Sequence, residues 1–278
     1  MSAERQDDEA GKPARPQAWQ PFTPLGVAAF ARAGMGRALA LLMVMGVLIG
    51  LVMAWFVRSA WFPPLGQAVA ALPLAGEIVE GRLQVPLAQP QALADNQFLS
   101  LAVDLEHTGE QTPPADVQLE FGATNLYVRG VLGYVAVTYP PDYRVPLNQR
   151  EAVPWWGAWS QAILAGVWVG TTMGLLLIWG VLALGYVPLA RVVAWLRGAE
   201  LGVGAAWSLC AAALMPGALI MTLGIVAYGW GLVDLIRLGL VTLFHVMVAW
   251  VYVPLAVCCL PRAAGSAAPQ GNPFANKS

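Results

Sequence analysis

The sequence predicts a membrane-spanning α-helical protein that also carries a small β-rich domain outside the cytoplasm. Three observations lead to this fold class. First, 58% of the residues are hydrophobic and 11% are charged, whereas a typical soluble domain has roughly 25% charged residues. Second, the apolar residues are concentrated in four long runs. Third, the long polar segment between the first two runs shows the alternation of apolar and polar residues that is typical of β-strands.

The four apolar runs are long enough to be membrane spans, since a span needs about 20 mostly apolar residues to cross roughly 30 Å of hydrocarbon. The first run is uncharged and lies between Arg37 and Arg58. It is too long for the apolar core of a signal peptide, so we expect an uncleaved anchor. The runs are 38–57, 159–186, 201–229 and 238–260.

A turn, rather than one continuous helix, is expected between the third and fourth runs. Asp234 and Arg237 lie between them. Each would cost about 2.5 kcal/mol or more in the hydrocarbon. The sequence therefore favours two separate spans joined by a short loop.

Arginines near the span ends predict the orientation, because cytoplasmic loops carry an excess of Lys and Arg. With the N-terminus inside, five arginines flank the spans on the cytoplasmic side and three flank them on the other side. We therefore expect a multi-pass protein of the cell (inner) membrane with both termini in the cytoplasm. The five are Arg32, Arg37, Arg191, Arg197 and Arg262, and the three are Arg58, Arg150 and Arg237.

The chain divides into nine segments on this interpretation. The polar tails contain too little apolar surface to fold. The segments are a cytoplasmic tail with an interfacial segment (1–37), the first span (38–57), an extracytoplasmic β-rich domain (58–158), the second span (159–186), a cytoplasmic interfacial loop (187–200), the third span (201–229), a short extracytoplasmic loop (230–237), the fourth span (238–260) and a disordered cytoplasmic tail (261–278).

The outer segment has the strand patterns of a small antiparallel sheet or sandwich. Residues 77–85 are typical of a hairpin with Glu80-Gly81 near its turn. Residues 99–106 alternate apolar with polar side chains, which predicts a half-buried strand. Similar patterns at 117–121, 126–128 and 132–139 complete the series. About five short strands are expected, which suits a small sheet.

Glycines predict helix-packing faces in two of the spans. Gly166, Gly170 and Gly174 recur every four residues in the second span, and Gly46 and Gly50 form one such pair in the first. The absence of side chains along such a stripe lets another helix approach closely. The partner helix belongs either to the same chain, which we favour because glycine is common in membrane helices, or to a second copy.

The third and fourth spans each contain one unusual feature. Pro216-Gly217 predicts a kink in the third span; broken helices can form transporter sites, although a packed kink is the commoner outcome. His245 lies in the interior of the fourth span and is a candidate intramembrane polar site. Because no span contains an acidic partner, we expect a neutral imidazole bonded to a carbonyl or hydroxyl group rather than a proton relay.

Catalytic, metal and nucleic-acid signatures are missing from the sequence. It contains no HExxH, no Gly-x-Ser-x-Gly, no phosphate-binding loop and no Cys-x-x-Cys. His107 and His245 show no metal-site spacing, so no catalytic residue, metal or cofactor is expected. The net charge of −1 argues against binding nucleic acid. We interpret Asp104, Glu106 and His107 as a solvated sheet face.

Two short motifs carry a resemblance to a known family. Leu72-Pro73 followed by Gly76–Leu83 is similar to an "LP…G.L" hairpin, and Val103–Gly109 is similar to a "hydrophobic-Asp-x-x-Gly" strand and turn. Both belong to an uncharacterised family of bacterial inner-membrane proteins, known in some bacilli as maltodextrin-utilisation accessory proteins. The resemblance implies one span, an outer β domain and then several spans, and it implies no activity or functional residues.

The leading functional interpretation is a non-enzymatic membrane protein. It would be an accessory protein, scaffold or sensor whose outer domain binds an envelope partner or a ligand. The expected partners are the lipid bilayer and either a membrane or envelope protein or a second copy of the chain. The alternative is a small transporter or channel component that uses the kinked third span and His245. A membrane-embedded enzyme ranks third, because no motif supports it.

Overall fold

The computed structural model describes residues 20–86, 90–108 and 113–262. The predicted tails fall largely on residues 1–19 and 263–278, which lie outside the described residues. The chain folds into two compact units. The helical unit consists of the described residues within Met1–Gly46, Met173–Leu223 and Gly239–Ser278, and the β-rich unit of those within Val47–Thr172 and Gly224–Leu238.

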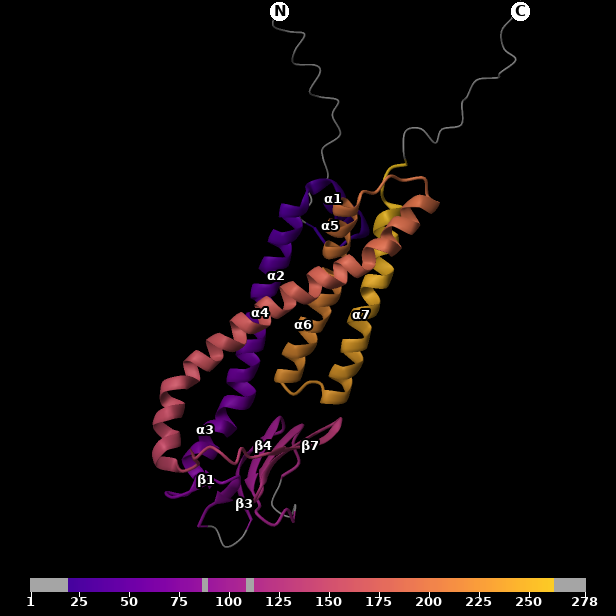
Figure 1. The fold of residues 1–278 in the computed structure, drawn as a ribbon. Coiled ribbons are helices and arrows are strands. Elements are labelled where there is room, and N and C mark those ends of the chain that lie inside the picture. The colour runs from indigo at the N-terminus through magenta and orange to yellow at the C-terminus, as the bar shows by residue number, and fades with distance from the viewer. Residues whose placement is uncertain (1–19, 87–89, 109–112, 263–278) are drawn as a thin grey trace, which may run out of the picture. The chain divides into compact units, whose positions relative to one another are not determined.

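The described residues form seven α-helices and one π-helical segment. Four helical stretches in this part of the chain are long and apolar enough to cross a membrane, which confirms the four predicted runs: Met35–Ala71, Gln149–Leu196, Val203–Gly229 and Leu235–Cys258. The elements are α1 (Pro24–Ala33), α2 (Met35–Phe56), the π segment η1 (Val57–Trp61), α3 (Phe62–Ala71), α4 (Gln149–Leu196), α5 (Val203–Ala213), α6 (Met215–Gly229) and α7 (Leu235–Cys258) (Figure 1).

Helix α4 is longer than the predicted second span. It has 48 residues, which at about 1.5 Å per residue is about 72 Å, more than twice the hydrocarbon thickness. It therefore includes the last part of the predicted outer domain and most of the predicted loop 187–200. Glu151 and Arg191 bound the uncharged stretch, but glutamate and arginine are good helix formers, so the helix includes both residues.

The helical unit contains a capped helix α1 and a hydrogen bond between α5 and α4. Thr23 caps α1 by accepting a hydrogen bond of 3.1 Å from the Gly26 N–H, and Phe30 of α1 is buried. Trp207 of α5 donates a hydrogen bond of 3.1 Å to the carbonyl of Gly180 in α4. Tryptophan in an apolar setting usually finds such a partner for its N–H.

The β-rich unit contains eight strands among the described residues, in two sheets of order β2-β1-β8 and β3-β4-β5-β6-β7. The predicted hairpin is confirmed, because β1 and β2 pair antiparallel. Glu80 and Gly81 have φ angles of 50° and 73°, as a type I′ turn requires. The strands are β1 (Glu77–Val79), β2 (Arg82–Gln84), β3 (Gln91–Asp95), β4 (Leu99–Val103), β5 (Val117–Phe121), β6 (Asn125–Gly130), β7 (Gly133–Thr138) and β8 (Val145–Pro146).

One strand pair departs from the antiparallel sheet that we predicted. Strands β4 and β5 are parallel, with Leu99 beside Val117. A parallel pair needs a crossover of about a dozen or more residues, and residues 104–116 supply it. His107, in the part of the crossover that follows β4, contacts Glu120 of β5.

The core of the β-rich unit lies between α3 and the five-stranded sheet. Ala68 of α3 and Leu72, which directly follows this helix, are buried in one cluster with Leu101 of β4. Strand β3 has a bulge at Leu93, and a bulge redirects side chains locally. Leu93 belongs to the same buried cluster, so the apolar face of α3 packs on the sheet.

Candidate functional site

The π segment η1 is attached to the turn between β3 and β4. The side-chain amide of Asn96 donates a hydrogen bond of 2.6 Å to the carbonyl of Ala60. The Asn96 Oδ1 accepts hydrogen bonds of 2.9 Å from the N–H groups of Phe98 and Leu99. One side chain therefore both shapes the turn and fixes it to the helix. Single π turns inside α-helices are frequent at functional sites.

Three buried aromatic rings surround this attachment. They come from Phe56 at the end of α2, Phe98 before β4 and Tyr228 in the last turn of α6. Their centroids lie 5.0–5.5 Å apart, within the range for favourable aromatic pairs. The Tyr228 hydroxyl donates a hydrogen bond of 2.6 Å to the carboxylate of Asp116. The ends of two candidate spans are thus bonded to the sheet.

A cavity of about 510 Å³ lies between the sheet, α3 and the first turns of α4. Its size is in the range of about 300–1,000 Å³ that is typical of small-molecule sites. Its walls include Ala68, Leu93 and Leu101, which are buried and apolar. Its rim includes Trp155, which is 54% exposed, and Glu151. Glu151 is the one charged residue among those that line the cavity.

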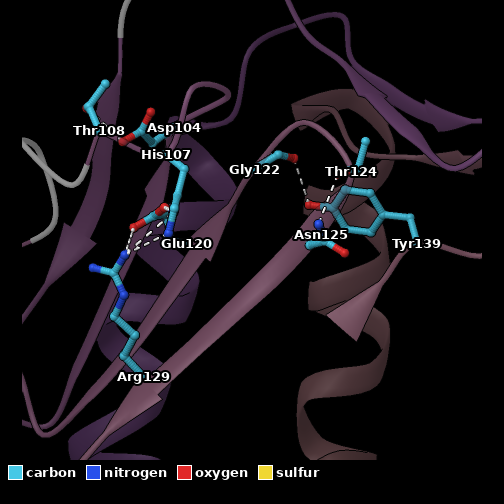
Figure 2. A network of polar contacts seen from close by, with 9 residues as sticks. All are labelled: Asp104, His107, Thr108, Glu120, Gly122, Thr124, Asn125, Arg129 and Tyr139. Carbon is cyan, nitrogen blue, oxygen red and sulfur yellow. Dashed lines mark hydrogen bonds and ion pairs between the residues drawn. The ribbon is translucent and has the colours of Figure 1, made fainter. Parts of the chain in front are cut away.

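A second candidate site is a polar cluster around Glu120, whose side chain is fully buried. Its carboxylate pairs with Nδ1 of His107 and lies 3.3 Å from the guanidinium of Arg129. Figure 2 shows the carboxylate between these two side chains. The His107 ring also stacks on Tyr127 with centroids 3.9 Å apart. A buried carboxylate requires such partners to offset its desolvation, and here they come from the segment after β4 and from β6.

The prediction of a solvated face for this region is wrong for Asp104, which is 1% exposed and accepts a hydrogen bond of 2.9 Å from Thr108. Glu106 and His107 are exposed. Glu120 in β5, which we did not single out from the sequence, has a fully buried side chain and contacts His107. The sequence feature that could have indicated this arrangement is the long segment between β4 and β5, because its length allows the two strands to pair in parallel.

The predicted glycine faces have different surroundings. Gly46 and Gly50 lie in α2, and a Cβ at Gly50 would stand 2.9 Å from the carbonyl of Trp168 in α4. Glycine at this position therefore allows α2 and α4 to approach closely. Outside their own helix, no described atom lies within 4 Å of a Cβ built at the three glycines of the second-span stripe. The helix that packs on this stripe, in the same chain as we favour or in a second copy, stays a prediction. The stripe is Gly166, Gly170 and Gly174.

The structure brings Gly217 and His245 together. A Cβ at Gly217 would stand 2.5 Å from the carbonyl oxygen of His245, so glycine lets α6 approach α7 (orange and yellow in Figure 1). The His245 Nδ1 lies 2.5 Å from the carbonyl of Thr242 and donates to it. The helix break falls at Leu214, and Pro216 lies in the first turn of α6, where its missing N–H is tolerated.

Comparisons with protein-family models, curated proteins and solved structures gave no match. The resemblance to the accessory family therefore stays a prediction. Within the described ranges, no group of three or more His, Cys, Asp and Glu residues is arranged to hold a metal ion. The candidate functional site therefore consists of the Asn96–Ala60 attachment and the neighbouring cavity.

Proposed function

We propose that the chain is a non-enzymatic integral membrane protein, a sensor or accessory protein, whose β-rich domain lies outside the cytoplasm and binds a ligand or an envelope partner. Four apolar helical stretches support the membrane location. The arginine bias at the span ends supports the orientation. The observation that carries the function is the hydrogen bond from Asn96 to Ala60, because it connects a ligand-sized cavity to a helix that continues as a span.

The connection can be followed residue by residue. Leu93 of β3 and Leu101 of β4 line the cavity, and Asn96 lies in the turn between these strands. Ala60 lies in the helical stretch Met35–Ala71. If a ligand in the cavity shifts either strand, the Asn96 amide that is bonded to η1 therefore shifts as well. A π turn is a local irregularity of the helix, so η1 is where we expect the response.

The transporter alternative draws on His245 and the break in the third span. The imidazole of His245 donates to a carbonyl of its own helix, which is the arrangement expected for a structural histidine. Gly217 is occupied in packing against the His245 backbone. Both observations favour the sensor or accessory function.

Hydrogen exchange of the full chain in lipid nanodiscs tests the connection. Asn96→Asp keeps the acceptor oxygen that shapes the turn and removes the N–H that reaches Ala60, whereas Asn96→Ala removes both. We expect both variants to exchange faster in residues 57–62, and Asn96→Ala alone to exchange faster in residues 96–99. Asp95→Asn, at an exposed neighbouring position, is the matched control and should leave both segments unchanged. Wild-type exchange in 57–62 for both Asn96 variants would contradict the proposal.

A further inference from the structure

We infer that the cavity between α3, α4 and the five-stranded sheet holds one acyl chain of a membrane phospholipid. The inference rests on the proposed function and names its ligand. Three properties of the cavity carry it: its apolar walls, its place beside two helices that continue as spans, and the single carboxylate at its rim.

The walls suit a hydrocarbon chain. Leu65 and Val69 of α3 and Leu72, which directly follows it, line the cavity. Leu93 and Leu101 line it from the sheet. Burial of apolar surface is the main driving force for binding an uncharged chain. A polar ligand would leave its hydrogen-bonding groups unpaired against these side chains, at a cost in affinity.

The helices place the cavity within reach of the bilayer. The stretch Met35–Ala71 has 37 residues, which at about 1.5 Å each is about 55 Å, well beyond the hydrocarbon thickness of roughly 30 Å. Its last part, α3, therefore projects from the membrane. At the rim, Trp155 is 54% exposed, and Trp156 packs edge-to-face on Phe62 with centroids 4.9 Å apart. Tryptophan prefers the headgroup level, so a bilayer lipid can insert a chain without crossing water.

The rim selects the head group. Glu151 is exposed and is the one charged residue that lines the cavity. A carboxylate at this point attracts a head group that presents an ammonium, and it repels the carboxylate of a free fatty acid. The occupant is therefore a phospholipid or lysophospholipid with an ammonium head group.

Photo-crosslinking in nanodiscs tests the assignment. The probe is an ethanolamine phospholipid with a diazirine at the end of one acyl chain, and the crosslinked peptides are mapped by mass spectrometry. We expect labelling within residues 91–103 in the wild type. Ala152→Trp should reduce this labelling at least about tenfold, because Ala152 lines the cavity. The larger indole would fill space that the acyl chain needs, and close-packed surroundings cannot make room for both. Val153→Trp, the adjacent exposed position that does not line the cavity, should label like the wild type.

Two further comparisons keep the outcome clear. If Ala152→Trp does not fold, Ala68→Leu fills the cavity from α3, and Ala70→Leu at an exposed position is its control. Excess unlabelled ethanolamine lysophospholipid should suppress the labelling, and the same concentration of free fatty acid should not. If Ala152→Trp or Ala68→Leu folds and labels like the wild type, the lipid assignment is overturned. If free fatty acid suppresses the labelling as strongly as the lysophospholipid does, the head-group assignment is overturned.

The test also separates this inference from the proposed function. Absent labelling together with faster exchange at 57–62 in the Asn96 variants would reject the lipid and retain the sensor or accessory function. Labelling as expected together with unchanged exchange at 57–62 would retain the lipid site and reject the connection to the helix.

Discussion

The hydroxyl of Tyr228 donates a hydrogen bond of 2.6 Å to the carboxylate of Asp116, although the two residues are 112 positions apart in the chain. Tyr228 lies in the last turn of α6, and Asp116 immediately precedes β5. The bond therefore attaches the end of the third candidate span to the five-stranded sheet, beside the ring of Phe98.

Tyr228→Phe should destabilise the β-rich unit, because it removes the donor and keeps the ring. A hydrogen bond to a charged group contributes about 1.5–3 kcal/mol, and we expect the lower end because Asp116 is partly exposed. The measurement is denaturant unfolding in detergent, with hydrogen exchange of residues 113–117. Asp116→Asn retains an acceptor oxygen, so its free energy of unfolding should fall less than that of Tyr228→Phe. Wild-type unfolding of Tyr228→Phe would show that the bond contributes nothing.

Arg129→Met should destabilise the protein more than Glu120→Gln. The arginine change leaves the buried Glu120 carboxylate with fewer partners, and breaking a buried ion pair from one side costs about 3–5 kcal/mol. We expect the lower end because the Arg129 side chain is 32% exposed. Glu120→Gln removes the charge and leaves Arg129 able to turn toward solvent. In a double-mutant cycle, adding Arg129→Met to Glu120→Gln should cost little; additive losses would exclude an interaction between the two residues.

The β-rich unit should lose stability in alkaline solution through Tyr139. Burial, and secondarily Tyr127, raises the pKa of the Tyr139 phenol. The folded state then holds this proton at pH values where the unfolded chain releases it, so the free energy of unfolding falls as pH rises above the ordinary tyrosine pKa of about 10. The Tyr139 hydroxyl donates a hydrogen bond of 3.2 Å to Gly122 (Figure 2). Tyr139→Phe should flatten the alkaline decline measured by unfolding between pH 9 and 11; an unchanged slope would assign the decline to other groups.

His245→Gln should be nearly silent, and His245→Ala should be mildly destabilising. Glutamine retains an N–H that can donate to the Thr242 carbonyl, whereas alanine removes it, and an unsatisfied partner costs about 1–3 kcal/mol. Thermal stability in detergent and proton-coupled uptake in vesicles are the measurements. Proton-coupled flux that is present in the wild type and lost in a folded His245→Gln variant would favour the transporter function.

Local signals in the sequence were enough to predict several elements. The Glu80-Gly81 turn could be predicted because a type I′ turn needs residues that tolerate positive φ. The alternation at 117–121 identified β5, and the four apolar runs identified four helices of spanning length. In each case the determining residues are adjacent in the chain.

The candidate site could not be predicted, because its parts are far apart in the chain. Asn96 and Ala60 are separated by 36 residues, and an asparagine between two strands is also an ordinary turn residue. The burial of Glu120 depends on the parallel pairing of β4 with β5, which strand patterns alone do not reveal. The cavity is lined by α3, by strands of both sheets and by the first turns of α4, and no sequence motif indicates that these segments meet.

The side of the membrane on which the β-rich domain lies is tested by single-cysteine labelling in a chain whose native Cys210, Cys258 and Cys259 are replaced by alanine. Leu132→Cys reports on the β6–β7 turn, where Leu132 is fully exposed. Glu200→Cys reports on the exposed connection between α4 and α5. With a membrane-impermeant maleimide, we predict labelling of Leu132→Cys in intact cells and of Glu200→Cys only after permeabilisation. Labelling of Glu200→Cys in intact cells, with Leu132→Cys protected, would place the domain in the cytoplasm and contradict the proposed function.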